Sequence, residues 1–221
     1  MPKVKMPRSS PSMDMTPMVD LAFLLVTFFI LTASFKNPEP VQVLTPSSTA
    51  EKLMPENAVL ITIAKDGRVF YTVSGFEVRK KVLKRMAANP KYKMSFTEAQ
   101  INEFGKMSSI GVSMQNLGKF IDTDPGSRER FPSKGIPMDS LNNQLRDWIQ
   151  YGWIEGATKY KELKDEADAA GRELQAEPLR FAIKADANTN YIVVKEVIKT
   201  FTDLKIYRFN LLTNCEKGPT E

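Results

Sequence analysis

One acidic residue lies inside an apolar segment near the N-terminus, and its chemistry distinguishes it from the rest of that segment. Asp20 is the only charged residue in the stretch "TPMVDLAFLLVTFFILTASF", residues 16–35. Thr16, Asp20, Thr27 and Ser34 follow one another at spacings of four, seven and seven residues, so on a helix they share one face. A carboxyl group on such a face can take up and release a proton along a protein-lined, partly wet path.

The segment from Pro17 to Phe35 is long enough to cross a membrane. As a helix it rises about 28 Å, close to the roughly 30 Å of a bilayer core. Residues 21–35 alone reach only about 22 Å, so a span that ends before Lys36 draws Asp20 inside the hydrocarbon. An ionised carboxylate there costs about 2.5–3.5 kcal/mol at the bilayer centre, which favours protein surroundings. The alternative is an Asp20 at the headgroup boundary without a role.

The charges that flank the segment predict its orientation. Three basic residues and one acidic residue precede it, whereas Lys36 is the only base in the fifteen residues that follow. The positive-inside rule then places the N-terminus in the cytoplasm and the residues from about 37 onward outside. Two alternatives are a cleaved secretory signal, with small residues at 32–34, and a buried core helix of a soluble protein.

The composition excludes several classes of chemistry. There is no histidine and Cys215 is the only cysteine, so a Ser-His-Asp triad, a Cys-His dyad and a His/Cys metal site are excluded. Because no phosphate-cradling glycine loop or nucleophile elbow is present, we expect neither an enzyme nor a cofactor. The 31 basic and 26 acidic residues are interspersed, which favours a solvated surface over nucleic-acid binding. A disulfide between the Cys215 residues of two copies stays open.

Three sequence blocks in order resemble the ExbD/TolR family. The first is "MDMTPMVDLAFLLVTFFILTASF" (13–35), in which a Thr-Pro pair precedes a membrane-embedded Asp. The others are "VLITIAKDGRVFYTVSGFEV" (59–78) and "LRFAIKADANTNYIVVKEVIKTFTDLKIYRFNLLT" (179–213). In the last block the residues that match the family pattern are Ala185, Asp186, Tyr191, Val193 and Val194. The resemblance implies a single-span inner-membrane protein with a periplasmic domain.

The resemblance also implies partners and a mechanism. Family members dimerise, place their spans inside a ring of a multi-span partner resembling ExbB/TolQ, and couple proton flow to mechanical work. Asp20 would be the proton-carrying residue, and Thr16 and Pro17 would lie at the cytoplasmic entrance. The implied function is a proton-channel subunit that uses the proton motive force to energise TonB-dependent outer-membrane transport, with a TonB-like transducer and inner-membrane lipid as further partners and no nucleic acid.

Two alternatives to this function stay open. One is a TolR-like subunit of an envelope-maintenance or other surface motor. The other is a membrane-tethered periplasmic binding or scaffold protein, in which the span is only an anchor. The sequence departs from the family in one respect, because typical members pass quickly from the first periplasmic helix to the strand matching 179–185. Here a long polar section intervenes at about 90–178.

The predicted architecture is α+β with a single transmembrane helix. Its parts are a cytoplasmic tail at 1–16, the transmembrane helix at 17–35, a Pro-rich periplasmic linker at 36–57, a periplasmic domain at 58–215 with the insertion at about 90–178, and a C-terminal tail at 216–221. In the linker, Val41 and Val43 alternate with Gln42 like a very short strand. By family resemblance this strand would pair with a neighbouring sheet edge; an unstructured spacer is the alternative.

Hydrophobic periodicity predicts a β-β-α half, a helical insertion and a β-α-β half. The expected elements of the first half are strands at 58–64 and 68–74, joined by a turn with Gly67, and a helix at 76–88. The insertion is expected to hold helices at 97–121, 138–151 and 158–175, the first weakened by Gly105 and Gly111. The last half is expected to hold a strand at 179–185, a turn and helix cap at 186–189, a helix at 191–203 and a strand at 205–213.

For two sets of conspicuous side chains we expect a structural role and not a functional one. Trp148, Tyr151 and Trp153 could form a partner site, but aromatic residues at helical spacing favour the core. Asp186 has no partner carboxylate or base at a suggestive spacing, so we expect a turn and cap rather than a catalytic acid.

Overall fold

The computed structural model describes residues 15–32, 47–48, 57–139, 142–174, 176–212 and 214–215. The chain divides into two compact units, Met1–Asn37 and Pro38–Glu221. In the first unit the described residues form one helix, and in the second they form a mixed sheet with several helices. The α+β class predicted from the sequence is therefore confirmed.

The first unit contains helix α1 (Thr16–Thr32), which is 17 residues long. Pro17 lies in its first turn, where a missing N–H leaves no hydrogen bond unmade. At this end of the helix, the Val19 N–H donates to the Met15 carbonyl at 3.1 Å, which is the i to i−4 bond of an α-helix. Among the residues that the structure describes, no helix combines the length and the apolar character required to cross a membrane.

A four-stranded sheet forms the centre of the second unit. Its strands are β2 (Ala58–Ile63), β3 (Val69–Val73), β6 (Arg180–Ala185) and β7 (Phe209–Leu212). They are arranged in the order β3-β2-β6-β7, with β2 antiparallel to β3 and parallel to β6, and β6 parallel to β7. The two halves predicted from the sequence thus meet at the β2–β6 pair. The last strand begins four residues later than predicted, at Phe209.

The predicted hairpin between β2 and β3 is confirmed. Gly67 has φ +82°, a left-handed conformation that only glycine adopts without strain. Its N–H donates to the Ala64 carbonyl at 2.9 Å, and the Ala64 N–H donates to the Arg68 carbonyl at 2.9 Å. Because side chains alternate along a strand, Val59, Ile61 and Ile63 face the core together.

The two helices of the β-β-α and β-α-β halves have the predicted bounds. They are α2 (Phe76–Ala88) and α6 (Tyr191–Asp203). The predicted cap of α6 is wrong in its residue, because Asn190 accepts from the Ile192 N–H at 2.9 Å. Asp186 instead closes the preceding turn by accepting from the Asn188 N–H at 2.9 Å. Asp186 is thus used in an Asx turn, and Asn190 is the residue that caps the helix.

Three α-helices were predicted for the insertion, and the α-helices of its described residues have different bounds. Its elements are α3 (Glu98–Lys106), α4 (Met114–Asp122), the 3₁₀ helix η1 (Pro125–Arg130), β4 (Met138–Asp139), β5 (Asn142–Asn143) and α5 (Gln144–Ala169). The single helix predicted for 97–121 is wrong because the chain leaves the helical path to pair with the edge of β3. The Tyr71 N–H donates to the Ile110 carbonyl and the Ile110 N–H to the Tyr71 carbonyl, both at 2.8 Å.

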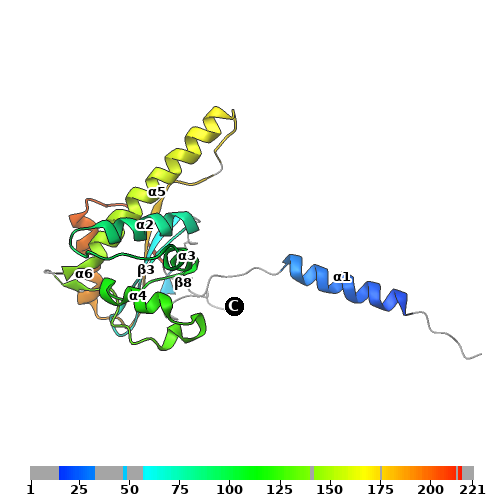
Figure 1. The fold of residues 1–221 in the computed structure, drawn as a ribbon, viewed down its shortest axis with the longest axis horizontal. Coiled ribbons are helices and arrows are strands. Elements are labelled where there is room, and N and C mark those ends of the chain that lie inside the picture. Colours follow the sequence, from blue (N-terminus) through cyan, green and yellow to red (C-terminus); the bar gives the residue numbers. More distant parts are fainter. Residues whose placement is uncertain are drawn as a thin grey trace, which may run out of the picture. The chain divides into compact units, whose positions relative to one another are not determined.

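The two helices predicted at 138–151 and 158–175 are also wrong, because α5 is one helix of 26 residues. Gly152 and Gly156 lie inside it and mark close contacts instead of breaks. A Cβ at Gly152 would overlap the Tyr71 hydroxyl, and one at Gly156 would lie 2.7 Å from Leu179 Cδ2. The helix extends well past the sheet at its C-terminal end (Figure 1).

The aromatic residues of α5 have different environments. Trp148 is fully buried, and its ring stacks on Phe104 with centroids 6.0 Å apart. Tyr151 packs partly buried against the core. Trp153 is 45% exposed, so the core interpretation is right for Trp148 and wrong for Trp153.

A second, very short sheet joins distant parts of the chain. Strand β1 (Ser47–Ser48) pairs in parallel with β8 (Asn214–Cys215). It lies in the segment predicted as the linker. Val41 and Val43, for which pairing with a sheet edge was predicted, lie outside the described residues.

Candidate functional site

The polar face predicted from the sequence lies on α1. Thr16, Pro17, Asp20 and Thr27 all belong to this helix, so Thr16, Asp20 and Thr27 share one face by their spacing of four and seven residues. Ser34, the last member of the predicted set, lies outside the described residues. The helix thus provides the geometry for part of the predicted site, and the role of these residues stays a prediction.

The remainder of α1 is apolar and exposed. Every large apolar side chain from Met18 to Leu31 is more than half exposed, and the helix has no buried residue. An apolar helix without a buried face requires lipid or another protein around it. Asp20 is the only charged residue in α1. It is therefore the one carboxyl group on this helix.

Threonine hydroxyls on α1 are engaged by their own helix. Thr27 Oγ1 donates to the Leu24 carbonyl at 2.9 Å, and Thr32 Oγ1 donates to the Phe28 carbonyl at 2.8 Å. With its proton used in this way, the Thr27 oxygen can accept a hydrogen bond but cannot donate one. Asp20 and Thr27 are about 10 Å apart along the axis. A proton can pass between them only through water or through side chains of a partner.

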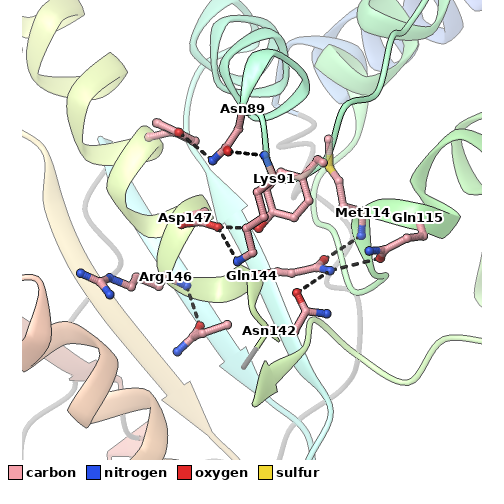
Figure 2. Close-up of polar contacts among 11 residues, drawn as sticks. Asn89, Lys91, Met114, Gln115, Asn142, Gln144, Arg146 and Asp147 are labelled. Atoms are coloured by element: carbon pink, nitrogen blue, oxygen red, sulfur yellow. Dashed lines mark hydrogen bonds and ion pairs between the residues drawn. The ribbon is translucent and has the colours of Figure 1, made fainter. Parts of the chain in front are cut away.

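A polar joint connects the loop after α2 to the first half of α5 (Figure 2). In the loop after α2, Asn89 Nδ2 donates to the Tyr151 hydroxyl at 3.0 Å. Lys91 Nζ lies 3.1 Å from Asp147 Oδ2, and the Tyr92 hydroxyl donates to the same oxygen. Burial, together with the hydrogen bond to Asp147 and its charge, raises the pKa of Tyr92 well above its usual range. The hydroxyl therefore keeps its proton and its bond to Asp147 at neutral pH.

A buried glutamine fixes the start of α5 to α4. Gln144 is fully buried, and its Oε1 accepts from the Met114 N–H at 2.8 Å. Its Nε2 donates to Gln115 Oε1 at 3.1 Å and to Asn142 Oδ1 at 3.4 Å, as Figure 2 shows. A buried amide with all these bonds made orients the two helices, whereas an unpaired one would cost about 1–3 kcal/mol.

Among the described residues, two ion pairs lie across the interface of α2 and α5, and one of them, Lys81 with Glu162, is exposed. Arg85 pairs with Glu155, whose carboxylate is buried in the described structure, while Arg85 is half-exposed. These joints hold helices in place; they do not form an acid-base site, because each carboxylate is occupied by a neighbouring cation or hydroxyl. Over the described ranges, no group of three or more acidic or cysteine side chains is arranged to hold a metal ion.

Sequence reasoning missed this joint for a physical reason. Lys91 and Asp147 are 56 positions apart, and Arg85 and Glu155 are 70 apart. No local spacing links residues at such distances. The one signal in the sequence was the uneven composition of α5, whose first half carries Trp148 and Tyr151 among isolated charges.

Comparison with known proteins gives one match. A family model described as biopolymer transport protein ExbD/TolR matches residues 6–216, which include α1, the four-stranded sheet and the whole insertion. No curated protein and no solved structure matches the chain.

Proposed function

The chain belongs to the ExbD/TolR family, and we propose that it is the proton-channel subunit of an ExbB-ExbD-type motor. The family provides energy-transducing subunits for biopolymer transport. Its members are inner-membrane proteins that oligomerise and associate with ExbB/TolQ-like partners. In the proposed motor, the proton motive force energises TonB-dependent transport across the outer membrane, with no enzymatic step and no cofactor in this chain.

The proposal assigns the segment from Pro17 to Phe35 to the membrane. Supporting it are the continuous apolar character of α1 and the exposure of its large side chains. The excess of basic residues before the segment favours a cytoplasmic N-terminus and a periplasmic domain. The span would lie within the ExbB/TolQ-like ring, beside the span of a second copy.

One observation carries the proposal, namely a single carboxylate on an otherwise uncharged apolar helix. A proton that crosses a potential of 100 mV releases about 2.3 kcal/mol. Alternate protonation of Asp20 in two copies would remove and restore one charge on each helix and so shift the helices within the ring. Thr16 and Pro17 would lie at the cytoplasmic entrance of the path. The linker would pass the motion to the periplasmic domain.

Replacement of the carboxylate tests the proposal. Asp20→Asn keeps the size and polarity of the side chain but cannot release a proton at neutral pH. We expect this variant to assemble with its ring partner, measured by co-purification, and to lose energised outer-membrane uptake to the level of cells without the protein. Asp14→Asn, just before the helix, is the matched control and should retain uptake. An Asp20→Asn variant with normal uptake would refute the proton-carrying role.

A membrane-tethered scaffold is the second candidate. The large insertion, whose Glu155 pairs with Arg85 of α2, favours it because it extends the surface available to other proteins. In a scaffold, Asp20→Asn would be harmless or stabilising, since it removes the cost of a charge in the membrane. A TolR-like motor would lose activity with Asp20→Asn as well. It is distinguished by which transducer co-purifies and by loss of envelope integrity instead of uptake.

A further inference from the structure

The C-terminal half of α5 extends beyond the domain. The buried residues of this helix end at Gly156. The remaining residues of the helix, 157–169, include none that is buried, and we call them the arm. The arm is about 20 Å long and extends past the sheet in Figure 1. Because the domain covers it only in part, its length calls for a reason beyond the packing of the core.

The arm carries an apolar stripe. Tyr160, Leu163 and Ala167 follow one another at spacings of three and four residues, and they continue the face by which α5 packs on the sheet. Leu163, Ala167, Ala170 and Leu174 line an open groove between the arm and the returning chain, together with the charged residues Glu166, Arg172 and Glu173. Within the described structure this stripe is only partly covered. The spacing is that of the seam of a coiled coil.

Two opposite charges lie along one edge of the stripe. Lys159 and Glu166 are seven residues apart, so both lie on the same side of the helix. Among the described residues, neither forms an ion pair; Lys159 Nζ lies 3.8 Å from the position of a Cβ at Gly75, just before α2. Glu162 is paired with Lys81 of α2 at 3.6 Å. The arm thus presents one positive and one negative group beside an apolar stripe.

We propose that the arm pairs with the arm of a second copy in an antiparallel arrangement. A two-fold axis between Tyr160 and Leu163 packs Tyr160 of each chain on the partner's Leu163. Lys159 then lies beside the partner's Glu166, and the pair occurs twice because the interface is symmetric. A parallel pair would instead bring Lys159 close to the partner's Lys164, which is repulsive. A partner helix that carries charges of only one sign would form an ion pair with only one of the two residues, Lys159 or Glu166.

The interface is small, and its strength follows from its size. One tyrosine, one leucine and a few alanines from each chain bury much less than the roughly 1,000 Å² of a stable interface. The pairing is therefore weak in solution and becomes significant where both chains are held in one membrane, at an effective concentration of about 1 mM. This last step rests on the proposed function.

Disulfide cross-linking in membranes tests the arrangement. Every copy of the full chain carries Cys215→Ser. One tagged copy also carries Trp153→Cys, and a second copy with a different tag carries Ala170→Cys. The antiparallel axis brings position 153 beside position 170 of the partner, while equal positions lie about 25 Å apart along the helices. We expect a cross-link in the mixture and at least tenfold less with either variant alone. Absence of the mixed product, or strong cross-linking of Ala170→Cys with itself, overturns the proposal.

Charge exchange tests the ion pairs in the same cross-linking assay. Lys159→Glu places two carboxylates together at both ends of the interface, so the yield should fall about tenfold. Lys159→Glu with Glu166→Lys restores opposite charges and should restore the yield. Lys161→Glu, on the far side of the helix, is the matched control and should leave it unchanged. A yield that does not respond to Lys159→Glu overturns the proposal. Loss of the chain from the membrane fraction would instead count against the proposed anchor.

Discussion

Gly152→Ala perturbs a close approach between the insertion and the sheet. At Gly152, α5 passes directly over the Tyr71 hydroxyl, which a Cβ would overlap. The Tyr71 ring cannot move aside easily, because it is fully buried against Trp148 with ring centroids 5.5 Å apart. The hydroxyl itself has no hydrogen-bond partner among the described residues. Burial raises the pKa of Tyr71 far above its usual range, so the group is neutral at any ordinary pH.

Two effects of opposite sign determine the size of the change. Alanine favours a helix interior over glycine by about 1 kcal/mol. The added methyl group also lies 3.3 Å from Tyr71 Cζ and 3.4 Å from Val59 Cγ2, and overpacking of a dense core costs about 1–3 kcal/mol or more. Because the overlap with the hydroxyl is severe, overpacking wins. We expect Gly152→Ala to be destabilising by about 1–2 kcal/mol, or about 2–8 °C in the unfolding midpoint of a domain of this size.

Tyr71→Phe removes both the overlapping atom and the unpaired hydroxyl. Alone it should leave stability unchanged or raise it by about 1 kcal/mol, since an unsatisfied buried group is lost. Combined with Gly152→Ala it should be at least as stable as the natural chain, because the helix preference of alanine is then gained without the overlap. The assay is urea unfolding of the full chain in detergent, followed by tryptophan fluorescence. The reasoning is refuted if Gly152→Ala costs the same free energy with and without Tyr71→Phe.

Two further predictions concern ionic contacts of the insertion. Arg85→Met leaves the Glu155 carboxylate buried without its cation, so the free energy of unfolding, measured with urea, should fall by about 1–3 kcal/mol. The double variant Arg85→Met with Glu155→Gln should recover most of this loss. If the double variant recovers nothing, the pairing is contradicted. Hydrogen bonds from Arg128 and Lys106, helped by their charges, hold the pKa of Glu103 below its usual range. Its stabilisation is therefore complete above the unfolded pKa of about 4.3 and is lost as the pH falls through the lower folded pKa. Glu103→Gln should therefore make the free energy of unfolding less dependent on pH between about pH 3 and 5. An unchanged slope of that free energy against pH would contradict this prediction.

The parts of the fold that sequence reasoning placed correctly are those with local causes. The bounds of α2 and α6 follow from a helical period that begins and ends within each segment. The hairpin follows from strand alternation on both sides of a turn that needs Gly67. In each of these elements, the residues that determine the structure lie within a few positions of one another.

The errors have long-range causes. The segment 97–121 has a helical pattern throughout, yet Ile110 pairs with Tyr71 on the edge of the sheet, and that contact is invisible to a local period. The interval between the helices predicted at 138–151 and 158–175 contains Gly152, yet α5 continues through it, and this glycine is required by the close approach of Tyr71. Trp148 and Trp153 have similar local sequence surroundings, but only the former faces the sheet.

The candidate site also has one part with local causes and one part with long-range causes. The face of Asp20 with Thr16 and Thr27 was predictable because helical spacing alone defines it. What surrounds that face depends on lipid and on other chains, so no pattern within this sequence specifies it. The contact of Lys91 with Asp147 joins segments that meet only in the folded domain, and sequence spacing carries no trace of it.

In the proposed motor, the short β1–β8 sheet is the first paired structure among the described residues that a pull along the chain from α1 would meet, because Ser47 and Ser48 precede β2. Two paired residues hold far less force than the four-stranded sheet, so this pair would separate first and leave the core of the domain intact.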